Sequence, residues 1–144
     1  QGSYAEARPL YERALVIFEK AFGPDHPGAA NVLNNLATVL GSLGLYEEAR
    51  LSLERVLAID GKVNGPEHPD VAISLNNLAT FLYGQGSYAE ARSLYERALR
   101  GLLNHLSFNL GSMTEVERFQ YLATKKGPES LLVNLLAMQI EVPD

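Results

Sequence analysis

A stretch of sixteen residues occurs twice in the chain, and this repeat limits what the chain can fold into. The first copy, GPDHPGAANVLNNLAT, runs from Gly23 to Thr38, and the second, GPEHPDVAISLNNLAT, runs from Gly65 to Thr80, 42 residues later. A second segment, GSYAEAR, occupies residues 2–8 and returns unchanged at residues 86–92, two periods later. A fixed period of this length is typical of stacked helical units, each of which contacts only its neighbours. The sequence therefore predicts a repeat array.

Apolar residues within each period recur at steps of three and four, which places them on one face of an α-helix. Pro27 and Pro69 favour the first turns of two helices. Pro9 lies inside the first helical pattern and predicts a bend or a frayed start there. The predicted helices span about residues 3–22, 27–40, 45–60, 69–83 and 87–106. The apolar stripe includes three tyrosines that we expect in the core, namely Tyr4, Tyr46 and Tyr88.

The repeat is lost after about residue 108. Ser112 and Glu115 fit a capping box, which predicts a helix over about 114–125. Gly127 and Pro128 precede a leucine-rich segment that predicts a last helix, ending near Ile140. The expected fold is an all-α, right-handed α-solenoid of antiparallel helix pairs with about seven helices. Its expected divisions are a half unit (1–22), two units (23–64 and 65–108) and C-terminal capping helices (109–144).

Composition excludes several classes of partner. The chain has 12 basic and 17 acidic residues and a net charge of −5, which disfavours nucleic acid and anionic membranes. It has no cysteine, so it has no disulfide framework. No apolar run has the roughly 20 residues that a membrane span needs. We expect a cytoplasmic protein, and its start in the middle of a repeat suggests part of a longer chain.

No residue pattern indicates catalysis, a cofactor or a metal. His26 and His68 precede Pro27 and Pro69 at equivalent positions, where they can cap helix starts. As metal ligands they would have to converge, whereas equivalent points on stacked helices lie about 10 Å apart. No Ser/His/Asp set or phosphate-binding glycine loop is present. We therefore expect a protein that is not an enzyme and binds neither metal nor cofactor.

These residues resemble the tetratricopeptide repeat family. The likeness rests on small residues at fixed places in paired helices, such as Ala37 and Ala49, and on the turn from Gly44 to Tyr46. The 42-residue period and the Gly-x-Asp/Glu-His-Pro turn are similar to the kinesin-light-chain type of unit. Residues 113–123 resemble the segment that joins such repeats to a caspase-like domain in bacterial proteins. The family resemblance implies protein binding, with the first helix of each pair lining a concave groove.

Adjacent asparagines in the middle of two helices stand out, because Asn is a mediocre helix former. With Leu33 and Leu36 facing the core, Asn35 points away from it, and the same holds for Asn77 in the second copy. The resemblance implies that these residues read the backbone of an extended peptide. A ladder of hydrogen bonds between neighbouring repeats is the alternative and is compatible with it. The expected peptide-binding residues are Asn31, Asn34, Asn35, Thr38, Asn76, Asn77, Thr80 and Tyr83.

Two functions remain open at this stage. The first is a protein-interaction module that binds a protein or peptide partner. The second is a structural or regulatory spacer that controls an attached effector domain and binds no separate peptide. We also expect self-association through residues 1–22, on a bare flank that contains Tyr4, Tyr11, Leu15 and Phe18.

Overall fold

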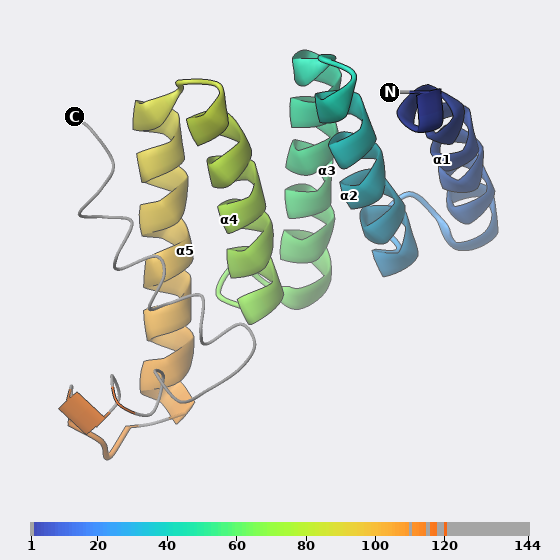
Figure 1. Cartoon of the computed structure of the whole chain (residues 1–144). Helices are drawn as coiled ribbons and strands as arrows, with labels where there is room; N and C mark the ends of the chain where they lie inside the picture. Colours follow the sequence, from blue (N-terminus) through green and yellow to red (C-terminus); the bar gives the residue numbers. More distant parts are fainter. Residues whose placement is uncertain (1, 110, 115, 118–119, 121–144) are drawn as a thin grey trace. The chain divides into compact units, whose positions relative to one another are not determined.

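The computed structural model describes residues 2–109, 111–114, 116–117 and 120. Within these residues the structure is helical and contains no strand. Figure 1 shows the helices in chain order. They are α1 (Gly2–Phe22), α2 (Pro27–Ser42), α3 (Tyr46–Asn64), α4 (Pro69–Gly84) and α5 (Tyr88–Asn109). The expected all-α architecture is confirmed, whereas most of the two helices expected beyond residue 113 lies outside the described residues.

Glycines end the first four helices at regular intervals. Gly23, Gly44, Gly65 and Gly86 all have positive φ angles, between 77° and 91°, and successive members are 21 residues apart, half of the sequence period. Glycine adopts this conformation without the steric penalty that a Cβ brings. At the end of α2, the N–H of Leu45 donates to Leu40 O, and that of Gly44 donates to Gly41 O. These two bonds form a Schellman motif, which stops the helix.

Histidines cap the starts of α2 and α4, as the sequence predicts. His26 Nδ1 accepts a hydrogen bond of 3.0 Å from the N–H of Gly28, and His68 Nδ1 accepts one of 3.1 Å from the N–H of Asp70. Both histidines have extended backbones, and Pro follows each of them at the first helical position. The imidazoles therefore satisfy helix N–H groups that have no partner within the helix.

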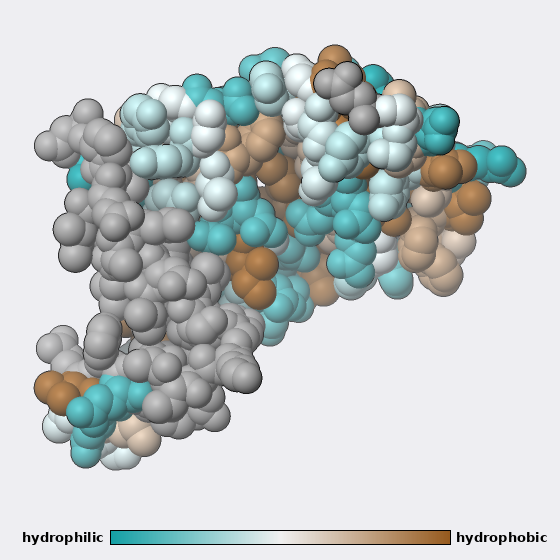
Figure 2. All heavy atoms as spheres, in the orientation of Figure 1, coloured by the Kyte–Doolittle hydropathy of each residue, from teal (hydrophilic) through white to brown (hydrophobic). Residues whose placement is uncertain are grey.

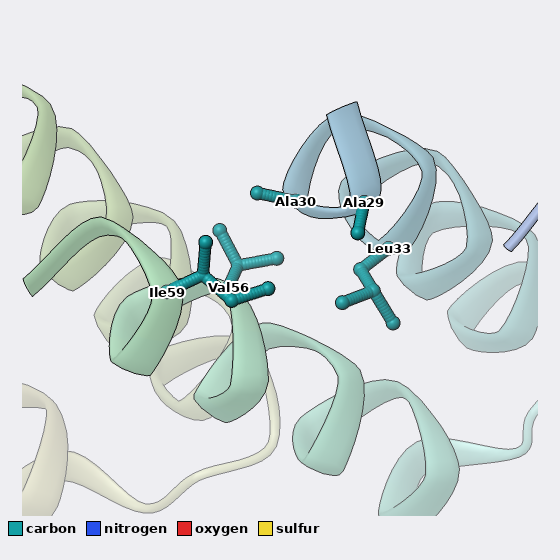
Figure 3. Close-up of a cluster of buried hydrophobic side chains, with 5 residues drawn as sticks. All are labelled: Ala29, Ala30, Leu33, Val56 and Ile59. Carbon is teal, nitrogen blue, oxygen red and sulfur yellow. The ribbon is translucent and has the colours of Figure 1, made fainter. Parts of the chain in front are cut away.

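The chain divides into two compact units, and the first contains residues 1–63. Its core is a cluster of small and branched side chains from α2 and α3, with Leu15 of α1 packed against it. Figure 3 shows the side chains of the two helices pointing toward one another. The cluster consists of Ala29, Ala30, Leu33, Val56 and Ile59, all at most 4% exposed.

Ion pairs also join α1 and α3 within this unit. Arg8 Nη2 lies 2.8 Å from Glu48 Oε2, and Arg55 pairs with Glu19. All four side chains are between 30% and 49% exposed, so each pair contributes at most about 1 kcal/mol. The apolar cluster is therefore the main source of stability in this unit.

The second unit begins at Asn64 and contains α4 and α5, which lie side by side (Figure 1). They run antiparallel, because the C-terminal end of α4 meets the N-terminal end of α5. At that end the Tyr83 and Tyr88 rings are 5.0 Å apart. Near the opposite end, a Cβ on Gly101 would lie only 3.6 Å from Pro66 O. The fully or almost fully buried side chains include Leu75, Leu78, Ala79, Leu82, Ala91, Tyr95, Ala98 and Leu102.

Several sequence expectations about burial are wrong. Tyr4, Tyr46 and Tyr88 are 41%, 47% and 40% exposed, so they lie at the edge of the core and not inside it. Leu10 and Phe22 also lie in the apolar pattern of the first predicted helix, which would direct them inward, yet they are 68% and 62% exposed. The helical pattern fixes the direction of a side chain, but burial also needs a neighbouring element on that side.

The flank of α1 that the sequence predicted to be bare is largely covered. Tyr11, Leu15 and Phe18 are half-buried, since Leu15 packs on the α2–α3 cluster and Phe18 lies against Gly28. Of the four residues expected on that flank, Tyr4 alone is exposed.

Three local details also differ from the sequence expectations. The helix around Pro9 begins at Gly2, so its start is not frayed, whereas the alternative expectation of a bend at Pro9 stays a prediction. α3 continues through Gly61 to Asn64, because an isolated glycine inside a helix costs only about 1 kcal/mol. The capping box near the C-terminus is formed by Thr114 and Glu117, two residues later in the chain than the expected pair, Ser112 and Glu115.

Candidate protein-interaction surface

One exposed side of α2 carries the first group of predicted binding residues. Asn31, Asn35 and Thr38 are exposed, and Asn34 is half-buried beside them. Ala29, Ala30, Leu33, Leu36 and Ala37 face the opposite way and are buried. We call the residues Asn31, Asn34, Asn35 and Thr38 the α2 amide face. Its outward direction confirms the prediction made from helical periodicity.

The equivalent side of α4 carries the second group. Asn77, Thr80 and Tyr83 are exposed, and Asn76 is half-buried. We call the residues Asn76, Asn77, Thr80 and Tyr83 the α4 amide face. Ile73, which is 36% exposed, stands where Asn31 stands in the first copy. The second face is therefore more apolar than the first.

The side-chain amides of these faces have no partner in the part of the chain that the structure describes. Among those residues, no hydrogen bond engages the side chain of any of the five asparagines: Asn31, Asn34, Asn35, Asn76 and Asn77. Each amide offers two donors and one acceptor oxygen. Because the side chains lie at the surface, water can satisfy them, and a ligand can replace that water at little cost.

The two threonine hydroxyls are less available than the sequence suggests. Thr38 Oγ1 donates to the backbone carbonyl of Asn34 at 3.2 Å, so its proton is used within the helix. Thr80 Oγ1 shares a hydrogen bond of 3.2 Å with the hydroxyl of Tyr95, which is 3% exposed. This bond fixes the Thr80 rotamer and ties the α4 amide face to the core of its unit.

An aromatic pair lies beside the α4 amide face. Tyr83 and Tyr88 meet edge to face at 5.0 Å, and both remain 40% exposed. The sequence reading identified Tyr83 but placed Tyr88 in the core. A sequence signal could have identified this pair. Tyr83 and Tyr88 are five residues apart on either side of the turn at Gly86, and this turn brings the two helix ends together.

Charge is absent from both faces. Residues 28–45 and 71–89 contain no Asp, Glu, Lys or Arg. The charged side chains lie mainly on α1, α3 and α5. The two faces therefore offer neutral hydrogen-bonding groups and apolar surface, and no charged side chain.

The described residues contain neither a candidate metal site nor a candidate membrane-spanning helix. They contain no group of three or more metal-ligating side chains, and His68 contacts another imidazole, that of His105, at 6.3 Å between ring centroids. No described helix combines the length and the hydropathy that a membrane crossing needs.

Comparison with known families is decisive for the fold. The model of the tetratricopeptide repeat family matches residues 1–62 and 52–104. The chain belongs to the tetratricopeptide repeat family. No curated protein matches it significantly.

Solved structures confirm the helical repeat fold and the kinesin-light-chain type of unit. A putative kinesin light chain from Podosopora anserina, described as having nearly identical TPR-like repeats, is 26% identical, with a TM-score of 0.62, over 99% of this chain and 70% of that one. A variant of that protein with one substitution is also 26% identical, with a TM-score of 0.64, over 98% and 67% of the two chains.

A third similar structure is BtubC (BKLC) from P. vanneervenii, which is 23% identical with a TM-score of 0.67. The match covers 98% of this chain and 53% of that one, so this chain spans about half of its length. The resemblance of residues 113–123 to a linker before a caspase-like domain stays a prediction, because most of them lie outside the described residues.

Proposed function

We propose that the chain is a non-enzymatic protein-interaction module whose α2 and α4 amide faces bind extended peptide segments. The observation that carries this proposal is the set of unbonded asparagine amides on two exposed, uncharged helix faces. Asparagine is unfavourable in the middle of a helix, and these side chains gain no compensating hydrogen bond from the described residues. Membership of a family of repeat proteins that bind other proteins supports the same conclusion.

The spacing of the amides suits an extended backbone. Asn31 and Asn35 are four residues apart, which places them about 6 Å apart along the helix axis. Alternate residues of an extended peptide are about 6.6 Å apart and present their backbone groups in the same direction. Two amides of the α2 amide face can therefore bond to alternate peptide groups of one ligand.

The two faces differ in the side chains that they accept. The α2 amide face is polar along its length, so it selects for backbone groups and small residues. The α4 amide face adds Ile73 and the exposed Tyr83–Tyr88 pair, which can contact an apolar or aromatic side chain of the ligand. We therefore expect the α4 amide face to bind an uncharged segment with an apolar side chain, and the α2 amide face to bind an uncharged segment without one.

A peptide-display screen against the chain, followed by calorimetric titration of the consensus peptide, tests the proposal. In the Asn35→Ala, Asn77→Ala double variant, the dissociation constant of a peptide bound on either face should rise roughly fivefold, at about 1 kcal/mol for the hydrogen bond lost on that face. Affinity should change little between low and high salt, since few charges are paired. Asn104→Ala is the matched control, because Asn104 lies on α5 and bonds to Glu67.

Two results would contradict this function. A screen that returns no consensus would favour the spacer that positions or regulates an attached domain. A double variant that binds normally but melts much lower would instead favour the asparagine ladder between repeats. Both asparagines are exposed within their own units, so folding of each unit should survive the change.

A further inference from the structure

One asparagine of the chain, Asn64, is followed directly by a glycine. Every other asparagine precedes a residue that carries a side chain. The difference matters because the backbone nitrogen of the following residue can attack the side-chain amide carbon of an asparagine. A side chain on the attacking residue hinders this approach, whereas glycine leaves it open. The sequence therefore makes Asn64 chemically different from the asparagines of the two amide faces.

The structure leaves Asn64 and its neighbour accessible to water. Asn64 is the last residue of α3, and its side chain is exposed. Gly65 lies outside the helix with a φ angle of 89°. Figure 2 shows hydrophilic residues, coloured teal, at the surface where Figure 1 places the end of α3. Solvent can therefore take part in a reaction between these two residues.

The backbone N–H of Gly65 is the group that would attack. It donates no hydrogen bond to another described residue, whereas the N–H of Gly23, at the equivalent repeat position, donates to Glu19 O at 3.0 Å. The asparagines inside α2 and α4 precede residues of the same helix, whose N–H groups belong to the helical ladder. Such an N–H cannot attack until the helix opens locally. Gly65 carries no such restraint.

We propose that Asn64 deamidates spontaneously and that the product destabilises the turn before α4. Hydroxide takes the proton of the Gly65 N–H, and the nitrogen forms a bond to Cγ of Asn64. The bond between Cγ and Nδ2 breaks, Nδ2 leaves as ammonia after it takes up a proton from water, and a cyclic imide remains. Water then adds to one of the two imide carbonyl carbons. Opening at Cγ gives aspartate, and opening at the main-chain carbonyl carbon gives isoaspartate.

Both products change the charge at the end of α3. The Asn64 Nδ2 group donates a long hydrogen bond of 3.5 Å to Asp70 Oδ2. A carboxylate in place of this donor sets two like charges against each other. The new negative charge also lies at the C-terminus of a helix, where the helix dipole disfavours it. Salt should weaken both effects, because both side chains are exposed.

Isoaspartate also lengthens the main chain by one methylene group. The insertion falls where the first compact unit, residues 1–63, ends and the second unit begins. The turn that follows is held against α5, since Glu67 Oε1 accepts a hydrogen bond of 2.8 Å from Asn104 Nδ2. A Cβ on Gly101 would lie only 3.6 Å from Pro66 O, so the turn packs closely there. The added methylene group must therefore disturb these contacts or strain the turn.

Incubation of the intact chain at mildly alkaline pH, followed by peptide mapping with mass spectrometry, tests the modification. The fragment that contains Asn64 should gain the mass difference between an oxygen atom and an NH group. It should separate into an aspartate form and an isoaspartate form, which fragmentation of the peptide backbone distinguishes. A synthetic peptide of residues 62–69 should convert at a comparable rate. Fragments that contain Asn35 or Asn77 should stay unchanged over the same period.

Two variants separate the causes. Asn64→Gln should abolish the conversion at this position, because the same attack would have to close a larger and less favourable ring. Asn64→Asp introduces the charge without lengthening the main chain, and it should lower the melting temperature of the full chain by roughly 2–5 °C. The isoaspartate form, purified by ion exchange, should melt lower than the Asn64→Asp variant.

Three results would overturn the proposal. Asn64 could stay intact in the folded chain while the synthetic peptide converts, which would show that the fold protects it. The product could be aspartate without isoaspartate, which would exclude the imide. The isoaspartate form could melt at the same temperature as the unmodified chain, which would show that the turn before α4 tolerates the change.

Discussion

The ring of Phe18 lies directly against the backbone of Gly28. A Cβ built on Gly28 would come within 2.4 Å of Phe18 Cε1, closer than two carbon atoms can approach. Phe18 also contacts Phe22 and His26, with ring centroids 5.8 and 6.3 Å away. The absence of a side chain at residue 28 therefore lets an aromatic group from α1 close over the start of α2.

Gly28→Ala should destabilise the first unit by about 1–3 kcal/mol, less the gain of up to about 1 kcal/mol from better helix propensity. Gly61→Ala is the control, because Gly61 lies inside α3 with no atom within 4 Å of its added Cβ. That change should stabilise the protein by up to about 1 kcal/mol. Chemical denaturation measures both. Equal stabilisation by the two variants would show that the Phe18 ring moves aside freely.

His26→Ala should cost about 1 kcal/mol, because the N–H of Gly28 loses the acceptor at Nδ1 and the Phe22–His26 ring contact at 4.8 Å is removed. His26→Asn keeps a capping acceptor and should recover part of this loss. Thermal melts of the three proteins measure the difference. A His26→Asn variant no more stable than His26→Ala would show that the ring contact, and not the cap, provides the stability.

The pKa of Glu117 lies below its ordinary value, because the backbone N–H of Thr114 and then its hydroxyl donate to the Glu117 carboxylate, each at 2.8 Å. The charged Glu117 carboxylate therefore stabilises this helix start at pH values above the ordinary pKa of a glutamate. That stabilisation is lost as the pH falls through the lowered pKa of the folded state. Thr114→Ala keeps the backbone donor, so it should raise the pKa of Glu117 only part of the way. Carbon NMR of the carboxyl group across an acid titration measures the shift, with Thr114→Ser as the control that should leave it unchanged.

Local signals in the sequence were enough to place most helix ends. Pro27 and Pro69 begin α2 and α4 as predicted, since proline suits a position whose N–H needs no partner. The outward direction of Asn35 and Asn77 also follows from helical geometry alone. Peptide binding by these residues stays a prediction, because it depends on a molecule that the sequence does not contain.

Tertiary packing decided the features that helical periodicity does not encode. Ser52 is polar, yet it is 8% exposed and satisfies its hydroxyl by donating to Glu48 O within α3. The Thr80 side chain is oriented by a hydrogen bond between its hydroxyl and that of Tyr95, fifteen residues away on the next helix. These outcomes depend on which helix lies alongside, and a pattern within one helix carries no information about that.

The comparison of Ile17 and Ile59 separates what the sequence determined from what the structure decided. The 42-residue period assigns both to one repeat position and one helix face, and this assignment is correct. Their exposures of 57% and 2% were set by the tertiary structure, because α2 covers Ile59 and no described helix covers Ile17 to the same extent. Periodicity fixes the direction of a side chain around its helix axis, whereas burial requires a second surface in that direction.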